Sequence, residues 1–379
     1  MSTPKRLVVG ITAPGSVNLL RGQLKYFYEQ GFITYLAAPD DPKTRAYTEQ
    51  EHCTLLPVAI ERDISLLRDL TALWTIFKHF RKVQPDIVNV GTPKMGLLGT
   101  LAGALTGVRK RIYTCRGFRY EHESGIKRKI LMLMEWITAR FAHQIICISP
   151  SVKSRGVADG VFNLDKCIVI NKGSSNGIDL SRFNPALIKP VEQETLTADL
   201  RLEGHFVYGF VGRLIDRKGI AELYEAFEQV CKENSNSRLL IVGPLEFEQI
   251  TDKTLVQKLQ EHPAVFMPGR TDNVPLYLSL MDVFVLPAWW EGFGNVLTEA
   301  AAMGVPVIST TGTGTVDAVS AGYNGILVPV KDSKALEAAM IELLTDTAKR
   351  EKMGENGKQW ALNFDREIIW EGMLEIYQS

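Results

Sequence analysis

Residues 282–305 read DVFVLPAWWEGFGNVLTEAAAMGV, and this stretch decides the fold. Its apolar start, which ends in Pro287, predicts a short buried parallel strand. The alanine-rich run before Gly304 predicts a helix that ends at a left-handed glycine, and a glycine-rich turn separates the strand from the helix. A strand, a turn and a helix in this order form the repeating unit of a doubly wound α/β sheet.

The turn has the composition of a phosphate-binding site. Its glycines let the backbone pass close to a ligand, and the N–H groups of Asn295 and Val296, at the positive end of the helix dipole, suit a diphosphate. Glu291 and Glu299 flank this site, and carboxylates that touched the phosphates would repel them. We therefore place one glutamate on a sugar hydroxyl and the other on a ribose, which predicts a nucleotide-sugar site.

This stretch also resembles the signature of a known family. EGFGNVLTE followed by AAAMGVPVI resembles the E-x7-E signature of the retaining nucleotide-sugar glycosyltransferases of family four, which have the GT-B fold. The resemblance implies that Glu291 faces the transferred sugar and that Glu299 binds the nucleotide ribose. It also implies that the donor contacts the turn and the helix start, at Phe293, Gly294, Asn295 and Val296. The alternative is a helix start with incidental acids, since glutamate is common in first turns.

A second motif points the same way. The apolar run Phe206–Val211 leads into GRLIDRKG at 212–219, and helical periodicity follows from Ile220 to Val230. This element resembles a Gly-Arg and Lys-Gly motif of the same family, which implies that Gly212, Arg213 and Lys218 lie at the donor diphosphate. Cleavage of the sugar–phosphate bond builds negative charge on the departing diphosphate, and fixed cations stabilise that charge without a metal. An isolated Arg and Lys at this spacing would instead be solvated surface.

Composition fits two ordinary cytosolic domains. A chain of 379 residues, 45% of them hydrophobic, can bury two cores, and its formal net charge of zero argues against general nucleic-acid binding. The five cysteines are scattered without a C-x-x-C pair, which favours reduced thiols rather than disulfides or zinc. The first apolar run, Leu7–Ala13, is too short for a signal peptide, and we expect no segment that spans a bilayer. The predicted location is cytoplasmic.

Strand-like runs alternate with helical patterns in both halves of the chain, which predicts an α/β protein with two Rossmann-like, doubly wound domains. In the first half the predicted strands are Leu7–Thr12, Ile33–Ala37, Asp86–Val90, Arg111–Thr114, Gln144–Ser149 and Cys167–Ile170, and the predicted helices are Ser65–Lys82, Lys94–Thr106 and Lys127–His143. In the second half the predicted strands are Phe206–Val211, Leu239–Val242, Val265–Met267, Val283–Leu286, Val305–Ser309 and Ile326–Val328.

The domain boundary is expected in the Gly-, Ser- and Asn-rich stretch Asn171–Pro185. Its sequences NGID and FNP resemble short motifs that the family has between its domains. The predicted domains are 1–175, which binds the acceptor, and 176–364, which binds the nucleotide sugar. Resemblance to other GT-B enzymes implies that a last helix, at Arg366–Tyr377 within 365–379, returns to the first domain. Ligands bind beyond the carboxyl ends of parallel strands, so both motifs should open onto a cleft across which the domains face each other.

The first domain departs from the family pattern. Asn89 and Arg116 stand where the family often has histidines, so no catalytic histidine is carried over. Arg116 in R-G-F brings the chain closer to a bacterial branch that builds polysaccharides and lipid-linked glycans. We predict that Arg116, Arg119 and Lys94 bind the acceptor. The turn at Gly15 brings N–H groups to the donor phosphate, or else is a bare β–α connection.

Cations are concentrated in one segment. Eight lie between Arg109 and Lys129 against Glu121 and Glu123, and the unusually apolar run 130–137 follows. Such a segment suits peripheral docking on the anionic inner face of a membrane and capture of an acceptor diphosphate. The alternative is a core helix preceded by a solvated loop. We favour an acceptor carried on a polyprenyl diphosphate, with soluble acceptors second.

The predicted activity is therefore a retaining, metal-independent hexosyltransferase that moves a hexose or N-acetylhexosamine from a UDP-sugar to a glycan in bacterial surface-polysaccharide assembly, with no cofactor. No D-x-D occurs in the chain, which removes the usual manganese-binding element of the other major glycosyltransferase fold. The departing diphosphate itself would take the acceptor proton, although the sequence leaves a nucleophilic Glu291 open. Arg270 and Asp272 either line the uracil pocket or form a surface turn. The alternatives are an epimerase on the same fold and a non-catalytic sugar-nucleotide-binding subunit.

Overall fold

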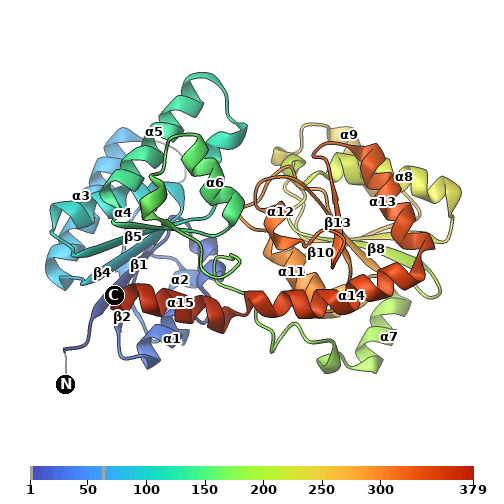
Figure 1. Cartoon of the computed structure of the whole chain (residues 1–379), viewed down its shortest axis with the longest axis horizontal. Coiled ribbons are helices and arrows are strands. Elements are labelled where there is room, and N and C mark those ends of the chain that lie inside the picture. The colour runs from blue at the N-terminus through green and yellow to red at the C-terminus, as the bar shows by residue number, and fades with distance from the viewer. Residues whose placement is uncertain (1–2, 62–64) are drawn as a thin grey trace. The chain divides into compact units, whose positions relative to one another are not determined.

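The computed structural model describes residues 3–61 and 65–379 and divides the chain into two compact units. Unit 1 consists of Met1–Gly177 with Glu367–Ser379, and unit 2 consists of Ile178–Arg366. Each unit is a parallel sheet with helices packed against it, as the strand and helix alternation predicted (Figure 1). The predicted fold class is confirmed.

Among the described residues, seven parallel strands form the sheet of unit 1 in the order β3-β2-β1-β4-β5-β6-β7. Its strands are β1 Arg6–Gly10, β2 Ile33–Ala38, β3 Thr54–Pro57, β4 Ile87–Gly91, β5 Lys110–Cys115, β6 Gln144–Cys147 and β7 Cys167–Ile168. The edge strand β3 was not predicted, because TLLP is too short to show a period. The strands β6 and β7 end two residues before their predicted ends.

Helices cover both faces of this sheet. Leu7 and Val9 of β1 face one cluster with α1 and α15, whereas Val8 between them faces another with α3 and α4. The helices of unit 1 are η1 Pro14–Leu20, α1 Gln23–Glu29, α2 Pro42–Gln50, α3 Leu66–Val83, α4 Pro93–Leu105, η2 Arg119–His122, α5 Gly125–Phe141, α6 Pro150–Ala158, η3 Leu164–Lys166 and α15 Arg366–Gln378. Of these, α3, α4, α5 and α15 match predicted helices to within two residues at each end.

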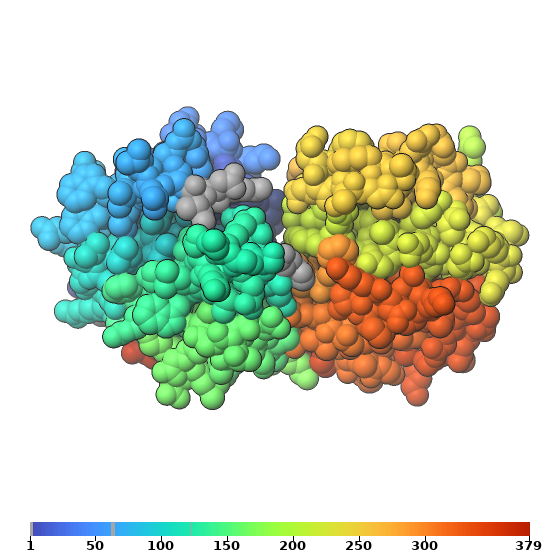
Figure 2. Space-filling view, turned by 90° about the horizontal axis from the view of Figure 1, so that it is seen from above, coloured from blue at the N-terminus to red at the C-terminus, as the bar shows by residue number. Residues whose placement is uncertain are grey.

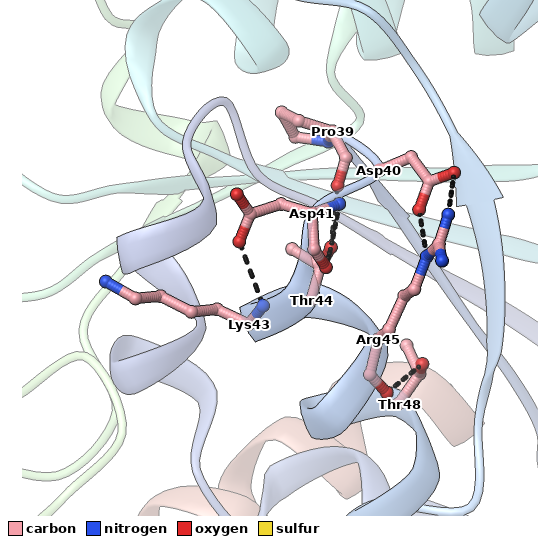
Figure 3. Close-up of polar contacts among 7 residues, drawn as sticks. All are labelled: Pro39, Asp40, Asp41, Lys43, Thr44, Arg45 and Thr48. Atoms are coloured by element: carbon pink, nitrogen blue, oxygen red, sulfur yellow. Dashed lines mark hydrogen bonds and ion pairs between the residues drawn. The ribbon is translucent and has the colours of Figure 1, made fainter.

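Local hydrogen bonds set the start of α2, directly after β2. The Asp41 carboxylate accepts from the Lys43 N–H at 2.9 Å, and the Asp41 N–H donates to the Thr44 hydroxyl at 3.1 Å, so the two residues cap the first turn reciprocally (Figure 3). Arg45 pairs with Asp40 through two hydrogen bonds of 2.6 and 2.9 Å. Asp41 therefore caps the helix, and Asp40 pairs with an arginine of its first turn.

Among the described residues, six parallel strands form the sheet of unit 2 in the order β10-β9-β8-β11-β12-β13. Its strands are β8 Phe206–Val211, β9 Ser237–Val242, β10 Val265–Gly269, β11 Val283–Leu286, β12 Val307–Thr310 and β13 Gly325–Val328. The helices of unit 2 are η4 Pro185–Leu187, α7 Pro190–Asp199, η5 Asp216–Lys218, α8 Ile220–Glu233, η6 Phe247–Gln249, α9 Lys253–Glu261, α10 Val274–Leu278, α11 Asn295–Ala302, α12 Thr315–Ala318, α13 Ser333–Thr345, α14 Thr347–Ala361 and η7 Leu362–Phe364. β8 and β11 pair at the centre of this sheet, so both predicted motifs follow neighbouring strands.

The NGID stretch is anchored by its asparagine. The Asn176 side chain accepts from Trp370 Nε1 at 2.7 Å and from Gln23 Nε2 at 3.0 Å, within unit 1. The last helix packs Ile369, Met373 and Tyr377 into the core of unit 1. The chain thus ends on the unit in which it began.

Candidate functional site

Glu291 lies in the turn between β11 and α11. Its N–H donates to the Thr313 carbonyl at 2.8 Å, which ties the turn to the loop after β12. Gly294 precedes α11 at φ 87°, a left-handed conformation that favours glycine, and α11 then begins at Asn295. The predicted strand, turn and helix are all present, and the helix ends just before Gly304, at φ 79°.

The Glu291 carboxylate binds two cations from the first motif. Its Oε1 lies 2.5 Å from Lys218 Nζ and 3.4 Å from Arg217 Nη1. The Lys218 and Glu291 side chains are only 11% and 15% exposed. The structure therefore brings together two residues that were predicted from separate motifs, seventy-three positions apart in the sequence. It also adds Arg217, for which no role was predicted.

Electrostatics in this cluster favour a charged glutamate. Burial by itself would raise the pKa of Glu291, but the charges of Lys218 and Arg217 outweigh burial and hold that pKa below its ordinary value. Burial lowers the pKa of Arg217, against the attraction of Glu291. Glu291 is therefore ionised near neutral pH and neutralises part of the positive charge beside it.

Two tryptophans that precede Glu291 contact the first motif and the helix after it. The Arg217 guanidinium lies over the Trp290 ring, 4.6 Å from its centroid, and the Trp289 N–H donates to the Arg217 carbonyl at 2.9 Å. Trp289 Nε1 donates to Glu222 at 2.8 Å, and Lys331 lies over the same ring. Arg217 lies more than seventy positions from both tryptophans in the sequence, so only the fold shows that they meet.

Arg213 has a different acidic partner. Its Nη1 donates to both carboxylate oxygens of Glu246, at 3.0 and 3.2 Å, and its side chain is 40% exposed. Glu246 follows β9, the neighbour of β8, and was not predicted. Gly212 begins the loop that carries Arg213, where its N–H donates to the Val242 carbonyl at 2.9 Å. Arg213 is thus oriented by a carboxylate while part of its guanidinium remains accessible.

Glu299 lies in α11, and its electrostatic partner is Arg182. Burial raises the pKa of Glu299 to about 7, and the charge of Arg182 opposes this rise. Arg182 Nη2 also donates to the Asp272 carbonyl at 2.5 Å, so the predicted base-binding loop is held by the residue that faces Glu299. The Arg270 and Asp272 side chains themselves are 67% and 99% exposed and lie 3.9 Å apart.

The other predicted donor residues lie in the turn before α11, in the first turn of α11 and in unit 1. The Phe293 side chain is buried against Phe364, with ring centroids 5.0 Å apart, so it anchors the turn from inside. Val296 lies in the first turn of α11 beside Asn295. Gly15 lies in unit 1, at the start of η1, and has open space where a side chain would be. The roles of all these residues toward a substrate stay predictions.

In unit 1, Arg116 follows β5 at the carboxyl edge of the sheet. Its Nε donates to the Ser175 hydroxyl at 2.6 Å, whereas Nη1 is enclosed and has no hydrogen-bond partner among the described residues. Burial lowers the pKa of Arg116 to about 10, so it remains charged at neutral pH. A Cβ on Gly91 would lie 1.5 Å from Nη1, so only glycine leaves room for this guanidinium. An enclosed cation with an unused donor suits an anion.

The other predicted acceptor residues are placed differently. Lys94 is 5% exposed and pairs with Asp69 at 2.8 Å, which ties α4 to α3. Arg119 is exposed in η2. Asn89, at a frequent histidine position, is buried between Thr114, at 2.7 Å, and the Tyr377 hydroxyl, at 2.6 Å. Asn89 therefore docks the last helix.

The basic segment does not form one surface. Lys110 and Arg111 lie at the amino end of β5, where they bind main-chain carbonyls of Ile376 and Phe141, and Arg116 follows the opposite end of the strand. Of the three consecutive cations in α5, Lys127 pairs with Glu123 at 2.6 Å, and Arg128 lies over the Tyr120 ring. Lys129 is exposed. Adjacent cations fall on different sides because helix neighbours are about 100° apart.

No cluster of three or more His, Cys, Asp or Glu side chains suited to a metal occurs in the described ranges 3–61 and 65–379. Within the same residues, no helix combines the length and apolar character required to cross a bilayer. Metal independence stays a prediction, since a substrate phosphate can complete a metal site.

Two family models match the chain. The model described as Glycosyltransferase Family 4 matches residues 15–182, and the model described as Glycosyl transferases group 1 matches residues 192–360. The first match lies within unit 1 apart from its last five residues, and the second lies within unit 2.

Several known proteins are similar over most of their length. The capsular polysaccharide biosynthesis glycosyltransferase CapM of Staphylococcus aureus is 36% identical over 97% of this chain and 96% of its own. The UDP-Gal:alpha-D-GlcNAc-diphosphoundecaprenol alpha-1,3-galactosyltransferase of Escherichia coli is 28% identical over 84% of this chain and 81% of its own. The crystal structure of Anabaena Alr3699/HepE with UDP and glucose has the same fold, with a TM-score of 0.83, 21% identity, and coverage of 99% of this chain and 100% of that one.

Proposed function

The chain belongs to glycosyltransferase family 4 and has the GT-B fold, and on this premise we propose a specific reaction for it. It moves a hexose or N-acetylhexosamine from a UDP-sugar, with retention of anomeric configuration and without a catalytic metal, to a glycan carried on a polyprenyl diphosphate. The product is an intermediate of bacterial surface-polysaccharide assembly. The observation that carries this proposal is the contact between Lys218 and Glu291, which joins the two donor-site motifs.

We assign different roles at the donor to the cations and to the carboxylate of this cluster. Lys218, Arg213 and the start of α11 stabilise the charge that grows on the departing UDP, and the Glu291 carboxylate holds a hydroxyl of the transferred sugar. When Lys218 turns toward the diphosphate, Arg217 remains beside Glu291 and keeps that carboxylate ionised. The departing diphosphate accepts the proton of the attacking hydroxyl on the face that it leaves, so the configuration is retained.

The acceptor assignment rests on a relative and on Arg116. The similar E. coli enzyme acts, by its name, on a sugar linked to diphosphoundecaprenol. Arg116 offers an enclosed guanidinium nitrogen, without a partner in the described residues, at the carboxyl edge of the unit 1 sheet. Such a charge suits a diphosphate better than a neutral sugar.

A donor screen tests the function as a whole. Purified protein is incubated with each of several UDP-sugars, with and without polyprenyl-diphosphate-linked glycan, and UDP release is measured. We expect rapid release that requires both one UDP-sugar and the acceptor. Turnover of a UDP-sugar without any acceptor would support an epimerase, and UDP-sugar binding without turnover would support a non-catalytic subunit.

Glu299 should make nucleotide binding depend on pH. Its carboxyl has a pKa of about 7 in the free protein, so it ionises as the pH rises from 6 to 8. An ionised carboxylate accepts ribose hydroxyl hydrogen bonds more strongly, so UDP affinity should rise over this interval. In Glu299→Gln this contribution should vanish, and at pH 8 Glu299→Ala should bind UDP roughly tenfold more weakly.

Calorimetry with UDP alone measures both effects. The terminal phosphate of UDP titrates in the same interval, but it does so equally in wild type and in Glu299→Gln, so their difference isolates the glutamate. Exposed Glu351→Ala is the matched control. Equal UDP affinity in wild type and Glu299→Ala would move Glu299 away from the ribose.

Activity should survive saturating EDTA. The proposed site already sets Lys218, Arg213 and the positive end of the α11 dipole against the diphosphate, so no divalent ion is needed to neutralise it. A metal can still speed product release by binding free UDP. Initial rates of UDP release before and after chelation check this, and a complete loss that added metal restores would contradict metal independence.

A further inference from the structure

Helix α3 has an apolar stripe that its own domain does not bury. Ala72, Ile76 and Phe80 pack into the core, and residues spaced at three or four positions on the opposite side of the helix face solvent. The exposed apolar side chains are Leu67 at 80%, Leu70 at 62% and Trp74 at 57%, with Leu66 at 79% beside them. The sequence predicted a helix here, but no function was predicted for its exposed side.

Helix α5 repeats this arrangement. Leu131, Glu135 and Thr138 face inward, and the opposite side exposes Ile126 at 78%, Ile130 at 43%, Leu133 at 54% and Trp136 at 49%. Both helices pack against α4, which is buried along most of its length, so all three cover the same face of the unit 1 sheet. In Figure 2 the light-blue atoms of α3 and the teal atoms of α5 both lie at the surface.

Cations flank both stripes. Helix α3 carries Lys78, Arg81 and Lys82, together with Arg68, which pairs with Glu61. Its acid, Asp69, pairs with the buried Lys94. Lys78 lies 5.4 Å from the centroid of the Trp74 ring, so a charge stands directly beside an exposed aromatic side chain. In α5, Lys129 and Arg140 lie on the exposed side, and the acid of this helix, Glu135, is buried.

We propose that α3 and α5 together form a docking surface for an anionic lipid bilayer. The leucines, isoleucines and tryptophans enter the boundary between headgroups and acyl chains, and the flanking lysines and arginines meet the lipid phosphates. This inference rests on the proposed function, because a polyprenyl-linked acceptor lies in such a bilayer. It moves the contact away from Lys110, Arg111 and Arg116, whose side chains donate hydrogen bonds within unit 1, and adds a second helix.

Charge decides between a bilayer and a second copy of the chain. A symmetric dimer through this surface would set two cationic helices against their own copies, and like charges in a desolvated interface are destabilising. An anionic bilayer instead pairs with the cations and buries the apolar stripe. Long basic side chains beside exposed tryptophan are typical of an interfacial helix.

Vesicle flotation tests the surface. The test variant is Leu67→Gln/Leu70→Gln/Trp74→Gln, which keeps helix formers in α3, and its matched control is Leu187→Gln/Val191→Gln at exposed apolar positions of unit 2. The vesicles are phosphatidylcholine with or without phosphatidylglycerol. We expect the α3 variant to bind the anionic vesicles at least about tenfold more weakly, while the control matches wild type. Wild type should bind pure phosphatidylcholine more weakly than the anionic mixture.

Wild-type binding by the α3 variant would overturn the proposal. A change in oligomeric state by sedimentation velocity, with unchanged vesicle binding, would assign the stripe to a second copy and overturn it as well. Turnover on a water-soluble acceptor analogue reports separately on the proposed reaction, and the α3 variant should retain it. Vesicle binding that is lost in the α3 variant would uphold the surface even if no UDP-sugar were turned over, and the proposed function alone would then fail.

Discussion

Lys218→Ala should lower turnover by about two orders of magnitude or more while the protein stays folded. The substitution removes a charge that is needed mainly in the transition state, where the sugar–phosphate bond breaks. Glu291 keeps Arg217 at 3.4 Å, so its buried carboxylate is not left without a cation. We therefore expect a large change in kcat and only a modest change in melting temperature.

The control is Lys352→Ala, which removes an exposed lysine of α14 in the same unit. It should turn over like wild type. The two variants are compared by their rates of UDP release at saturating donor and acceptor and by their thermal unfolding. If Lys218→Ala turns over at nearly the wild-type rate, Lys218 does not stabilise the leaving group, and its pair with Glu291 only supports the fold.

Arg213→Ala should lower turnover by a similar factor, about two orders of magnitude, through the same developing charge. The reason is its position at the end of β8, where Glu246 orients the guanidinium at 3.0 Å and leaves part of it accessible. Because the side chain is partly exposed, its loss should cost little stability.

Glu246→Gln separates charge from orientation. It retains a hydrogen-bond acceptor for Arg213 but removes the ion pair, so we expect a smaller loss of turnover than in Arg213→Ala. Steady-state kinetics with varied donor concentration distinguish the two effects. An Arg213→Ala enzyme with normal kcat and normal KM for the donor would remove Arg213 from the site.

Much of the fold could be predicted from local sequence patterns. The buried strands β8 and β11 and the helices α8 and α11 were visible from their apolar patterns and glycine boundaries. Elements that were not predicted include the edge strand β3, the short helices α1, α2 and α6, and the longer helices α13 and α14. Their formation depends on packing against the sheet and on caps such as Asp41.

The site was predicted where motifs concentrate chemistry in one short stretch. Lys218 and Glu291 were named from separate motifs, and the pairing of β8 with β11 explains why they meet. Arg217, Glu246 and Arg182 were missed because their partners are distant in sequence. For Lys94, the sequence shows a lysine at a loop end but not that Asp69 of α3 neutralises it.

The linkage formed from a UDP-α-sugar tests whether this chain is a retaining transferase that acts on a lipid-linked acceptor. Purified protein, the donor found by the screen and a polyprenyl-diphosphate-linked glycan are allowed to react, and the anomeric coupling of the product is read by NMR. We predict a new α-linkage, with one UDP released for each linkage formed. A β-linkage, or UDP formed without any new glycosidic bond, would contradict it.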